Sequence, residues 1–122
     1  MYTVYLLRCC NQSLYCGYTT DLSRRVFEHL YAKTGAKYTK RFPPIAIAAA
    51  WVIDSDLSHT LKIEHAIKAL TKQAKEKLVV SQNLASCITH INLKLTPKEY
   101  KSTQLKAIWG KAIQQKEVNN CL

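Results

Sequence analysis

Two tyrosines near the N-terminus, Tyr5 and Tyr15, are the first residues whose type and spacing could do chemistry. They lie in two short runs rich in Tyr, Val and Leu, and the polar residues 11–12 between the runs predict a β-hairpin. A loop of about three residues would pair Tyr5 with Gly17 and Leu7 with Tyr15, which places both phenols on one face. Gly17 would then leave open space beside the Tyr5 ring, where a ligand could approach. The alternative is that both rings only pack against a helix.

An arginine and a histidine follow on a predicted helix. Asp21 is a suitable N-cap, Gly35 a suitable stop, and apolar residues recur between them at helical spacing. The apolar stripe consists of Leu22, Val26 and Leu30. Arg25 and His29 lie together on its flank, whereas Arg24 points away and can pair with Glu28. That leaves Arg25 available to bind a phosphate, unless it is simply an exposed arginine.

A carboxylate on a second predicted helix could bind a divalent metal. Ser58 can cap this helix, and its buried stripe consists of Ile63, Ile67 and Leu70. Glu64 lies on the flank of that stripe in a chain with only 8 acidic residues, and such a carboxylate at the margin of a core is a candidate ligand. The alternative is a surface ion pair with Lys68, one turn further on.

The charge balance points to a polyanionic partner. The chain has 18 Lys and Arg against 8 Asp and Glu, a net charge of +10 and a pI of about 9.5. Basic and aromatic residues alternate in one segment, which predicts phosphate contacts and base stacking through Lys37, Tyr38, Lys40 and Arg41. We therefore favour nucleic-acid binding over a charge that serves only solubility.

Length and composition predict a single domain with no membrane partner. The chain has 122 residues, 48% of them hydrophobic, which suffices for one core. Its longest apolar run, Ile45 to Ile53, is too short to span a bilayer, and the N-terminus lacks the features of a secretory signal. The five cysteines form no CxxC pair and predict reduced thiols. We expect a cytoplasmic protein.

The remaining elements predict a mixed α/β (α+β) fold. The run Ile45 to Ile53 has the length of a buried strand, Thr71 can cap a third helix that ends near Val80, and residues 82–95 show no clear periodicity. A capping box that starts at Thr96 predicts a C-terminal helix from Pro97 to about Glu117.

The element order is then β-β-α-β-α-α, with a three-stranded, mainly antiparallel sheet flanked by helices and an added C-terminal helix. We expect residues 1–80 to form the core and residues 81–122 to form an extension packed on the same domain.

Taken in order, these motifs resemble those of the GIY-YIG nuclease superfamily, in particular its small stand-alone bacterial members. The first motif stands here as Thr3-Val4-Tyr5 and the second as Tyr15-Cys16-Gly17. Residues 21–29 look like the helix that carries the catalytic arginine, residues 35–39 like the basic segment, and residues 63–72 like the acidic helix.

The resemblance covers about residues 1 to 80 and includes three departures. Thr3 stands where the family name has Gly, Cys16 where it has Ile, and Tyr18 where some relatives carry Lys. A lysine at the position of Tyr18 could help to lower a tyrosine pKa, so this departure bears on the rate of catalysis more than on the fold.

The resemblance implies metal-assisted hydrolysis of DNA phosphodiesters, in DNA repair or processing. One Mg²⁺ or Mn²⁺ ion would be held by Glu64 and completed largely by water. Tyr5 would help to deprotonate the attacking water, and the metal's hydration shell, Arg25 and His29 could supply the nearby cation or relay that a phenol needs. Arg25 would also stabilise the scissile phosphate, and Tyr15 would orient it or share the relay. Either tyrosine remains a candidate for the base.

A binding protein is the competing hypothesis. A non-catalytic nucleic-acid-binding module could keep this fold, and it would bind DNA through the phosphate backbone without nicking it in the presence of a metal. The sequence leaves open the preferred substrate structure, the choice between DNA and RNA, and the oligomeric state.

Overall fold

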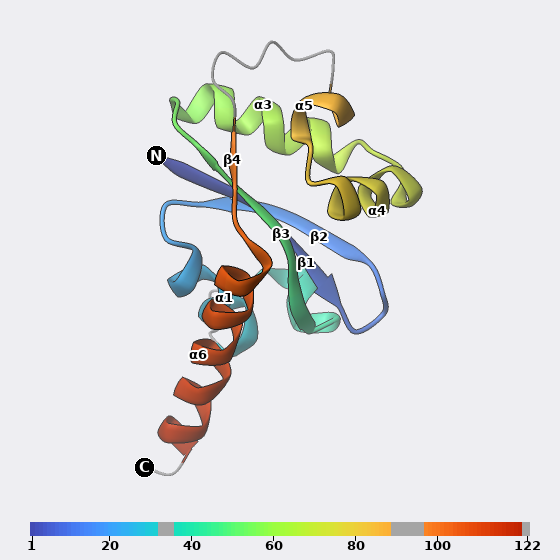
Figure 1. The fold of residues 1–122 in the computed structure, drawn as a ribbon. Helices are drawn as coiled ribbons and strands as arrows, with labels where there is room; N and C mark the ends of the chain where they lie inside the picture. Colours follow the sequence, from blue (N-terminus) through green and yellow to red (C-terminus); the bar gives the residue numbers. More distant parts are fainter. Residues whose placement is uncertain (32–35, 89–96, 121–122) are drawn as a thin grey trace.

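The computed structural model describes residues 1–31, 36–88 and 97–120 (Figure 1). The elements follow in the order β1 (Tyr2–Cys9), β2 (Leu14–Thr19), α1 (Leu22–Tyr31), α2 (Lys37–Arg41), β3 (Pro44–Ile53), α3 (Leu57–Lys68), α4 (Lys72–Ser81), α5 (Leu84–Cys87), β4 (Lys98–Glu99) and α6 (Ser102–Asn120). This arrangement confirms the mixed class and the antiparallel sheet flanked by helices. Across the described ranges, no helix combines the length and the apolar character needed to cross a membrane.

The sheet has four antiparallel strands in the order β2-β1-β3-β4. The prediction of three strands was wrong, because β4 adds a pair of residues opposite Trp51 and Val52, too short for any alternation to be recognised in the sequence. The predicted hairpin register is confirmed: Tyr5 pairs with Gly17, and Leu7 pairs with Tyr15. Strand β2 therefore lies at one edge of the sheet.

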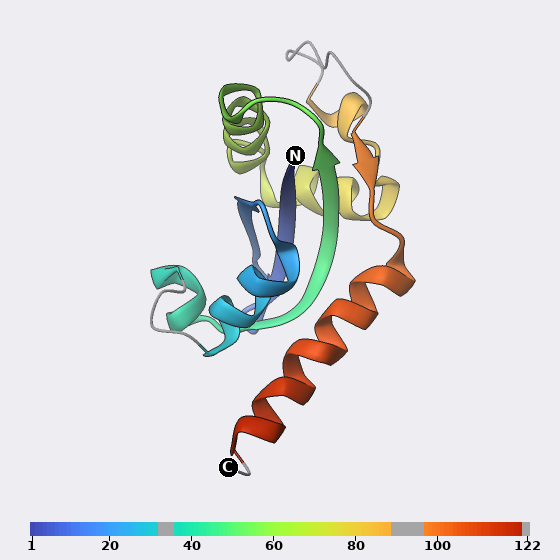
Figure 2. The ribbon, with the colours of Figure 1, turned by 90° about the vertical axis from the view of Figure 1, so that its left-hand side faces the viewer.

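Helices cover both faces of the sheet, as Figures 1 and 2 show from two directions. Side chains alternate along β1, so Val4 and Leu6 pack in a core with α3, α4 and α5, whereas Tyr5 and Leu7 pack on the opposite face with α1 and α6. Strand β3 contributes to both cores, which confirms the predicted buried strand at residues 45–53. Strand β2 forms the edge of the sheet between the two helical layers.

Caps set the start of each main helix. The Asp21 carboxylate accepts the Arg24 N–H at 3.1 Å at the start of α1, and the Thr71 hydroxyl accepts the Ala74 N–H at 3.1 Å at the start of α4, both as predicted. The predicted cap of the second helix was wrong. Asp56 accepts the His59 N–H at 2.8 Å, so α3 starts at Leu57 and Ser58 lies inside its first turn. The predicted stop at Gly35 lies outside the described residues.

The C-terminal helix α6 starts at Ser102, later than the predicted start at Pro97. Residues 98–99 pair with β3 instead, and the Lys101 N–H bonds to Gln104 Oε1 at 2.8 Å just before the helix. The predicted cap Thr96 lies outside the described residues. Leu105 of α6 is buried against the α1 face of the sheet. Residues 82–95 were predicted to be mostly irregular. Asn83 caps the short helix α5 within this range, and residues 89–95 lie outside the described residues.

Candidate active site

A groove of about 500 Å³ lies at the edge of the sheet and brings together four of the predicted site residues. Tyr5 and Tyr15 come from the hairpin, Arg25 from α1 and Glu64 from α3. These helices cover opposite faces of the sheet, and their side chains reach one groove because β2 is the edge strand between them. We call this site the edge groove.

Gly17 allows Tyr5 to lie close to the backbone of β2. A Cβ atom at Gly17 would lie 2.5 Å from the Tyr5 hydroxyl oxygen and 3.2 Å from Cε1 of Tyr15. The predicted open space for a ligand beside the Tyr5 ring was therefore wrong, since the Tyr5 ring itself fills that space. Any larger residue at position 17 would displace the phenol.

A buried chain of hydrogen bonds runs from Tyr5 through His29 to Thr39. The Tyr5 hydroxyl lies 2.6 Å from Nε2 of His29, and Nδ1 of His29 lies 2.8 Å from the Thr39 hydroxyl. The Thr39 hydroxyl donates its single proton to the Ala36 carbonyl at 3.0 Å, so it must accept from Nδ1–H. Nε2 of His29 is then left with a lone pair directed at the Tyr5 hydroxyl.

Burial controls the protonation of this chain. Burial raises the pKa of Tyr5, with Tyr15 adding to the effect and the charge of Arg25 opposing it. Burial, together with the nearby charge of Arg25, lowers the pKa of His29 to about 4. His29 is therefore neutral at pH 7 and can accept a proton at Nε2.

The depressed pKa of His29 predicts a loss of stability in acid. In the unfolded chain His29 takes up a proton near pH 6.5, whereas in the folded protein it stays neutral down to about pH 4. The unfolded state thus binds more protons between these values, and about 3 kcal/mol of unfolding free energy should be lost as the pH falls across them. Urea denaturation at several pH values measures this loss.

The matched comparison uses a second histidine. The variant His29→Gln should show a flatter dependence of unfolding free energy on pH than the wild type, whereas His59→Gln, on α3 outside the edge groove, should keep the wild-type dependence. Identical profiles for His29→Gln and the wild type would contradict the neutral, buried state of His29.

Arg25 has a different partner from the one expected. Its Nη1 lies 3.1 Å from Oε1 of Glu28, so the predicted pairing of Glu28 with Arg24 was wrong. Arg25 and Glu28 are three residues apart and both line the edge groove. The side chain of Arg25 keeps 24% of its surface exposed and remains accessible to a phosphate from the groove.

Glu64 lines the edge groove and pairs with Lys68, so the predicted ion pair is present, whereas the role of Glu64 as a metal ligand stays a prediction. The residue is 4% exposed, and its Oε1 lies 3.2 Å from Nζ of Lys68. No cluster of three or more potential metal-binding side chains occurs in the described part of the chain. A single carboxylate nevertheless fits Mg²⁺ or Mn²⁺, because such hard ions accept one protein oxygen together with water and substrate phosphate. The half-exposed Lys68 can turn aside for the ion.

The basic segment lies beside the edge groove rather than in it. Lys37, Lys40 and Arg41 are exposed on α2 and do not line the groove. Tyr38 lies against Tyr15, with ring centroids 6.1 Å apart and planes 19° from parallel.

Sequence reasoning missed a role for Thr39 and for three lysines near Tyr15, which are Lys68, Lys72 and Lys75. The sequence did contain a signal for two of these lysines. Lys72 and Lys75 stand in the first turn of a helix, where positive charge is unfavourable.

Known proteins similar in sequence to this chain indicate its family. A model of the GIY-YIG catalytic domain matches residues 1–77. A UPF0213 protein of Vibrio cholerae is 45% identical over 76 residues, which cover 62% of this chain and 74% of that protein. A UPF0213 protein of Natronomonas pharaonis is 43% identical over 79 residues, which cover 65% of this chain and 91% of that protein.

Among solved structures, the solution NMR structure of a UPF0213 protein from Bacillus halodurans is similar to this chain, with 36% sequence identity and a TM-score of 0.43. The match covers 79% of this chain and 100% of that chain. The catalytic-domain match covers more than half of the chain and ends within α4. On this ground the chain belongs to the GIY-YIG family of nuclease domains.

Proposed function

We propose that this protein is a metal-dependent endonuclease that hydrolyses phosphodiester bonds in DNA and serves in DNA repair or processing. The observation that carries the proposal is the 2.6 Å contact between the Tyr5 hydroxyl and Nε2 of His29, at a groove that also contains Arg25 and Glu64. A phenol hydrogen-bonded to a neutral imidazole can pass on a proton without first becoming a free phenolate.

Glu64 would hold the divalent ion, Mg²⁺ or Mn²⁺. When bound, the ion would supply a Lewis acid for the phosphate and a water of lowered pKa. Glu64 would approach the phosphate from the α3 side of the edge groove, whereas the two tyrosines and Arg25 would approach it from the α1 side.

Tyr5 would relay the proton of the attacking water. The Tyr5 oxygen takes a proton from the water as the phenol gives its own to Nε2 of His29, and the resulting hydroxide attacks phosphorus while the bond to the leaving oxygen breaks. That oxygen is protonated from solvent. The raised pKa of Tyr5, caused first by burial, favours this relay over a standing phenolate in the free protein.

Arg25 and Tyr15 would position the phosphate. The guanidinium of Arg25 would bind two phosphate oxygens and stabilise the extra negative charge of the transition state. A bound phosphate would also offset the charge of Arg25 that lowers the pKa of His29, so His29 would become a better base when substrate is present. Tyr15 would orient the phosphate from the edge of the groove.

The exposed α2 segment would bind DNA beside the cleavage site. Lys37, Lys40 and Arg41 would contact phosphates, and the partly exposed ring of Tyr38 would contribute stacking. The net charge of +10 supports binding dominated by phosphate contacts.

A cleavage assay tests the proposal. Flapped, nicked, single-stranded and duplex DNAs would be incubated with the protein in EDTA, Mg²⁺ or Mn²⁺, and products separated on denaturing gels. We expect cleavage of at least one substrate only when a metal is present. Salt-sensitive binding without cleavage on the whole panel would instead support the non-catalytic nucleic-acid-binding module.

A further inference from the structure

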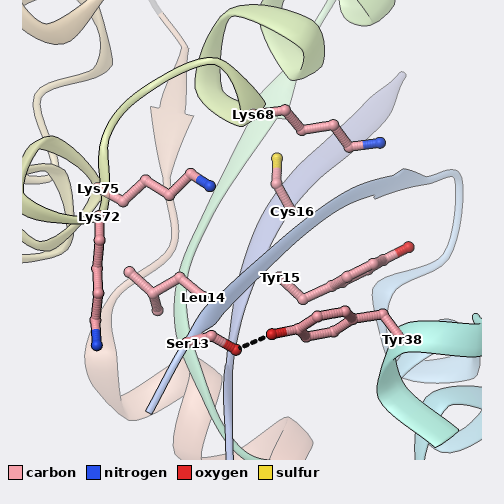
Figure 3. Close-up of a pocket in the computed structure, with 8 residues that line it drawn as sticks. All are labelled: Ser13, Leu14, Tyr15, Cys16, Tyr38, Lys68, Lys72 and Lys75. Carbon is pink, nitrogen blue, oxygen red and sulfur yellow. Dashed lines mark hydrogen bonds between the residues drawn. The ribbon is translucent and has the colours of Figure 1, made fainter. Parts of the chain in front are cut away.

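Figure 3 shows the residues that line a second pocket, of about 330 Å³. Its walls are residues 13–16 at the start of β2, Tyr38 of α2, and the lysines Lys68, Lys72 and Lys75 of α3 and α4. We call it the lysine pocket. It shares Tyr15 and Lys68 with the edge groove, so the two sites adjoin each other.

We propose that the lysine pocket binds one nucleotide of the strand whose phosphodiester lies in the edge groove. Its phosphate would contact Lys72 and Lys75, and its base would lie against Tyr38. This inference rests on the proposed function, since it assigns a neighbouring subsite to the same bound strand.

The charges around the pocket favour an anion. Among the described residues that line it, three are lysines and none carries a carboxylate. The two acids on the same helices as these lysines are already engaged: Glu64 pairs with Lys68 at 3.2 Å, and both oxygens of Glu76 bind Arg8. Within the described ranges, neither Lys72 nor Lys75 takes part in an ion pair.

The placement of these lysines lowers the stability of their own helix. Lys72 and Lys75 occupy the first turn of α4, which contains no acidic residue. Positive side chains are unfavourable there, because the helix N-terminus already carries partial positive charge. A phosphate in the pocket would turn this repulsion into attraction, since the lysines and the helix end would act on the same anion.

The aromatic wall is held in position before any ligand binds. The Tyr38 hydroxyl contacts the Ser13 hydroxyl and accepts a hydrogen bond from Nδ2 of Asn11 at 3.1 Å, which fixes the ring beside Tyr15 (Figure 3). Leu14 adds apolar surface, and burial raises the pKa of the Cys16 thiol to about 12, so this wall carries no negative charge. The pocket volume lies at the small end of the range for ligand pockets, which suits a single nucleotide.

The experiment measures the salt dependence of DNA binding in EDTA, so that no cleavage occurs. A short fluorescein-labelled single-stranded DNA is titrated with protein at several NaCl concentrations, and anisotropy gives the dissociation constant. For the double variant Lys72→Ala/Lys75→Ala, the slope of log affinity against log salt should become shallower by about 1.4, which corresponds to two lost phosphate contacts. Its melting temperature should not fall.

The matched control is Lys77→Ala, an exposed lysine of the same helix outside the pocket. It should keep the wild-type slope within about 0.3, because it removes the same charge without removing a phosphate contact. If it instead flattens the slope by about 0.7, half of the change in the double variant, the effect is general electrostatics and the lysine pocket is not a subsite.

The aromatic part of the subsite is tested at Tyr38. The variant Tyr38→Leu should weaken binding about tenfold without changing the salt slope, since stacking is not ionic. Tyr38→Phe keeps the ring but loses the hydroxyl contacts with Ser13 and Asn11, so its affinity should lie between those of Tyr38→Leu and the wild type. A correctly folded double lysine variant with the wild-type salt slope would overturn the subsite even if the wild type cleaves DNA. Absence of cleavage by the wild type would overturn the proposed function while leaving these binding results interpretable.

Discussion

Replacing Glu64 with Gln should reduce metal-dependent DNA cleavage by about a thousandfold. Gln keeps the size of the side chain but removes the charge that would hold the ion, and a loss of about 4 kcal/mol of transition-state stabilisation corresponds to that factor. DNA binding should be unchanged or tighter, because a carboxylate repels phosphate and its loss releases Lys68 from the 3.2 Å pair. Single-turnover cleavage and anisotropy in the same buffer measure both quantities.

If Glu64 does not bind the metal, its replacement should leave cleavage unchanged. If Glu64 only pairs with the half-exposed Lys68, its neutralisation lowers stability, because the carboxylate of this pair is buried, and leaves cleavage intact. Glu99→Gln serves as the control, since it neutralises a carboxylate on β4 away from the edge groove and should leave cleavage and binding unchanged. Calorimetric titration with Mn²⁺ adds a readout without DNA, in which only the Glu64 variant should lose metal binding.

Local signals in the sequence were sufficient for most of the fold. Alternating residues with a short polar loop fixed the register of the hairpin, and the side chains of Asp21 and Thr71 marked two helix starts. Strand β4 could not be predicted, because its two residues adopt strand structure only by pairing with β3. The start of α3 was ambiguous for a local reason, since Asp56 and Ser58 are both good caps and only the structure shows that Asp56 is the one used.

The sequence predicted which residues line the candidate site but not how their side chains contact one another. Spacing and family resemblance pointed to Tyr5, Tyr15, Arg25 and Glu64, all of which line the edge groove. The hydrogen bond between Tyr5 and His29, and the control of His29 by Thr39, depend on how α2 packs against α1 and on the close approach allowed by Gly17. These contacts join segments distant in sequence, and no periodicity encodes them.

A pair of tyrosine variants should identify the residue that relays the proton. Tyr5→Phe removes the hydroxyl that contacts Nε2 of His29 at 2.6 Å and should lower the single-turnover rate by about a hundred- to ten-thousandfold. Tyr15→Phe keeps the buried relay intact and should raise KM more than it lowers kcat, because Tyr15 acts on the position of the phosphate.

The expected contrast depends on the surroundings of the two rings. Tyr5 is 1% exposed and in contact with His29, so Tyr5→Phe leaves a buried imidazole nitrogen without its partner and should also lower stability by about 1–3 kcal/mol. Tyr15 is only half-buried, and its replacement should cost less stability. Melting curves separate these stability effects from the rates. Equal losses of kcat in the two variants would mean that Tyr15 shares the relay, and a larger loss in Tyr15→Phe would transfer the role of base to Tyr15.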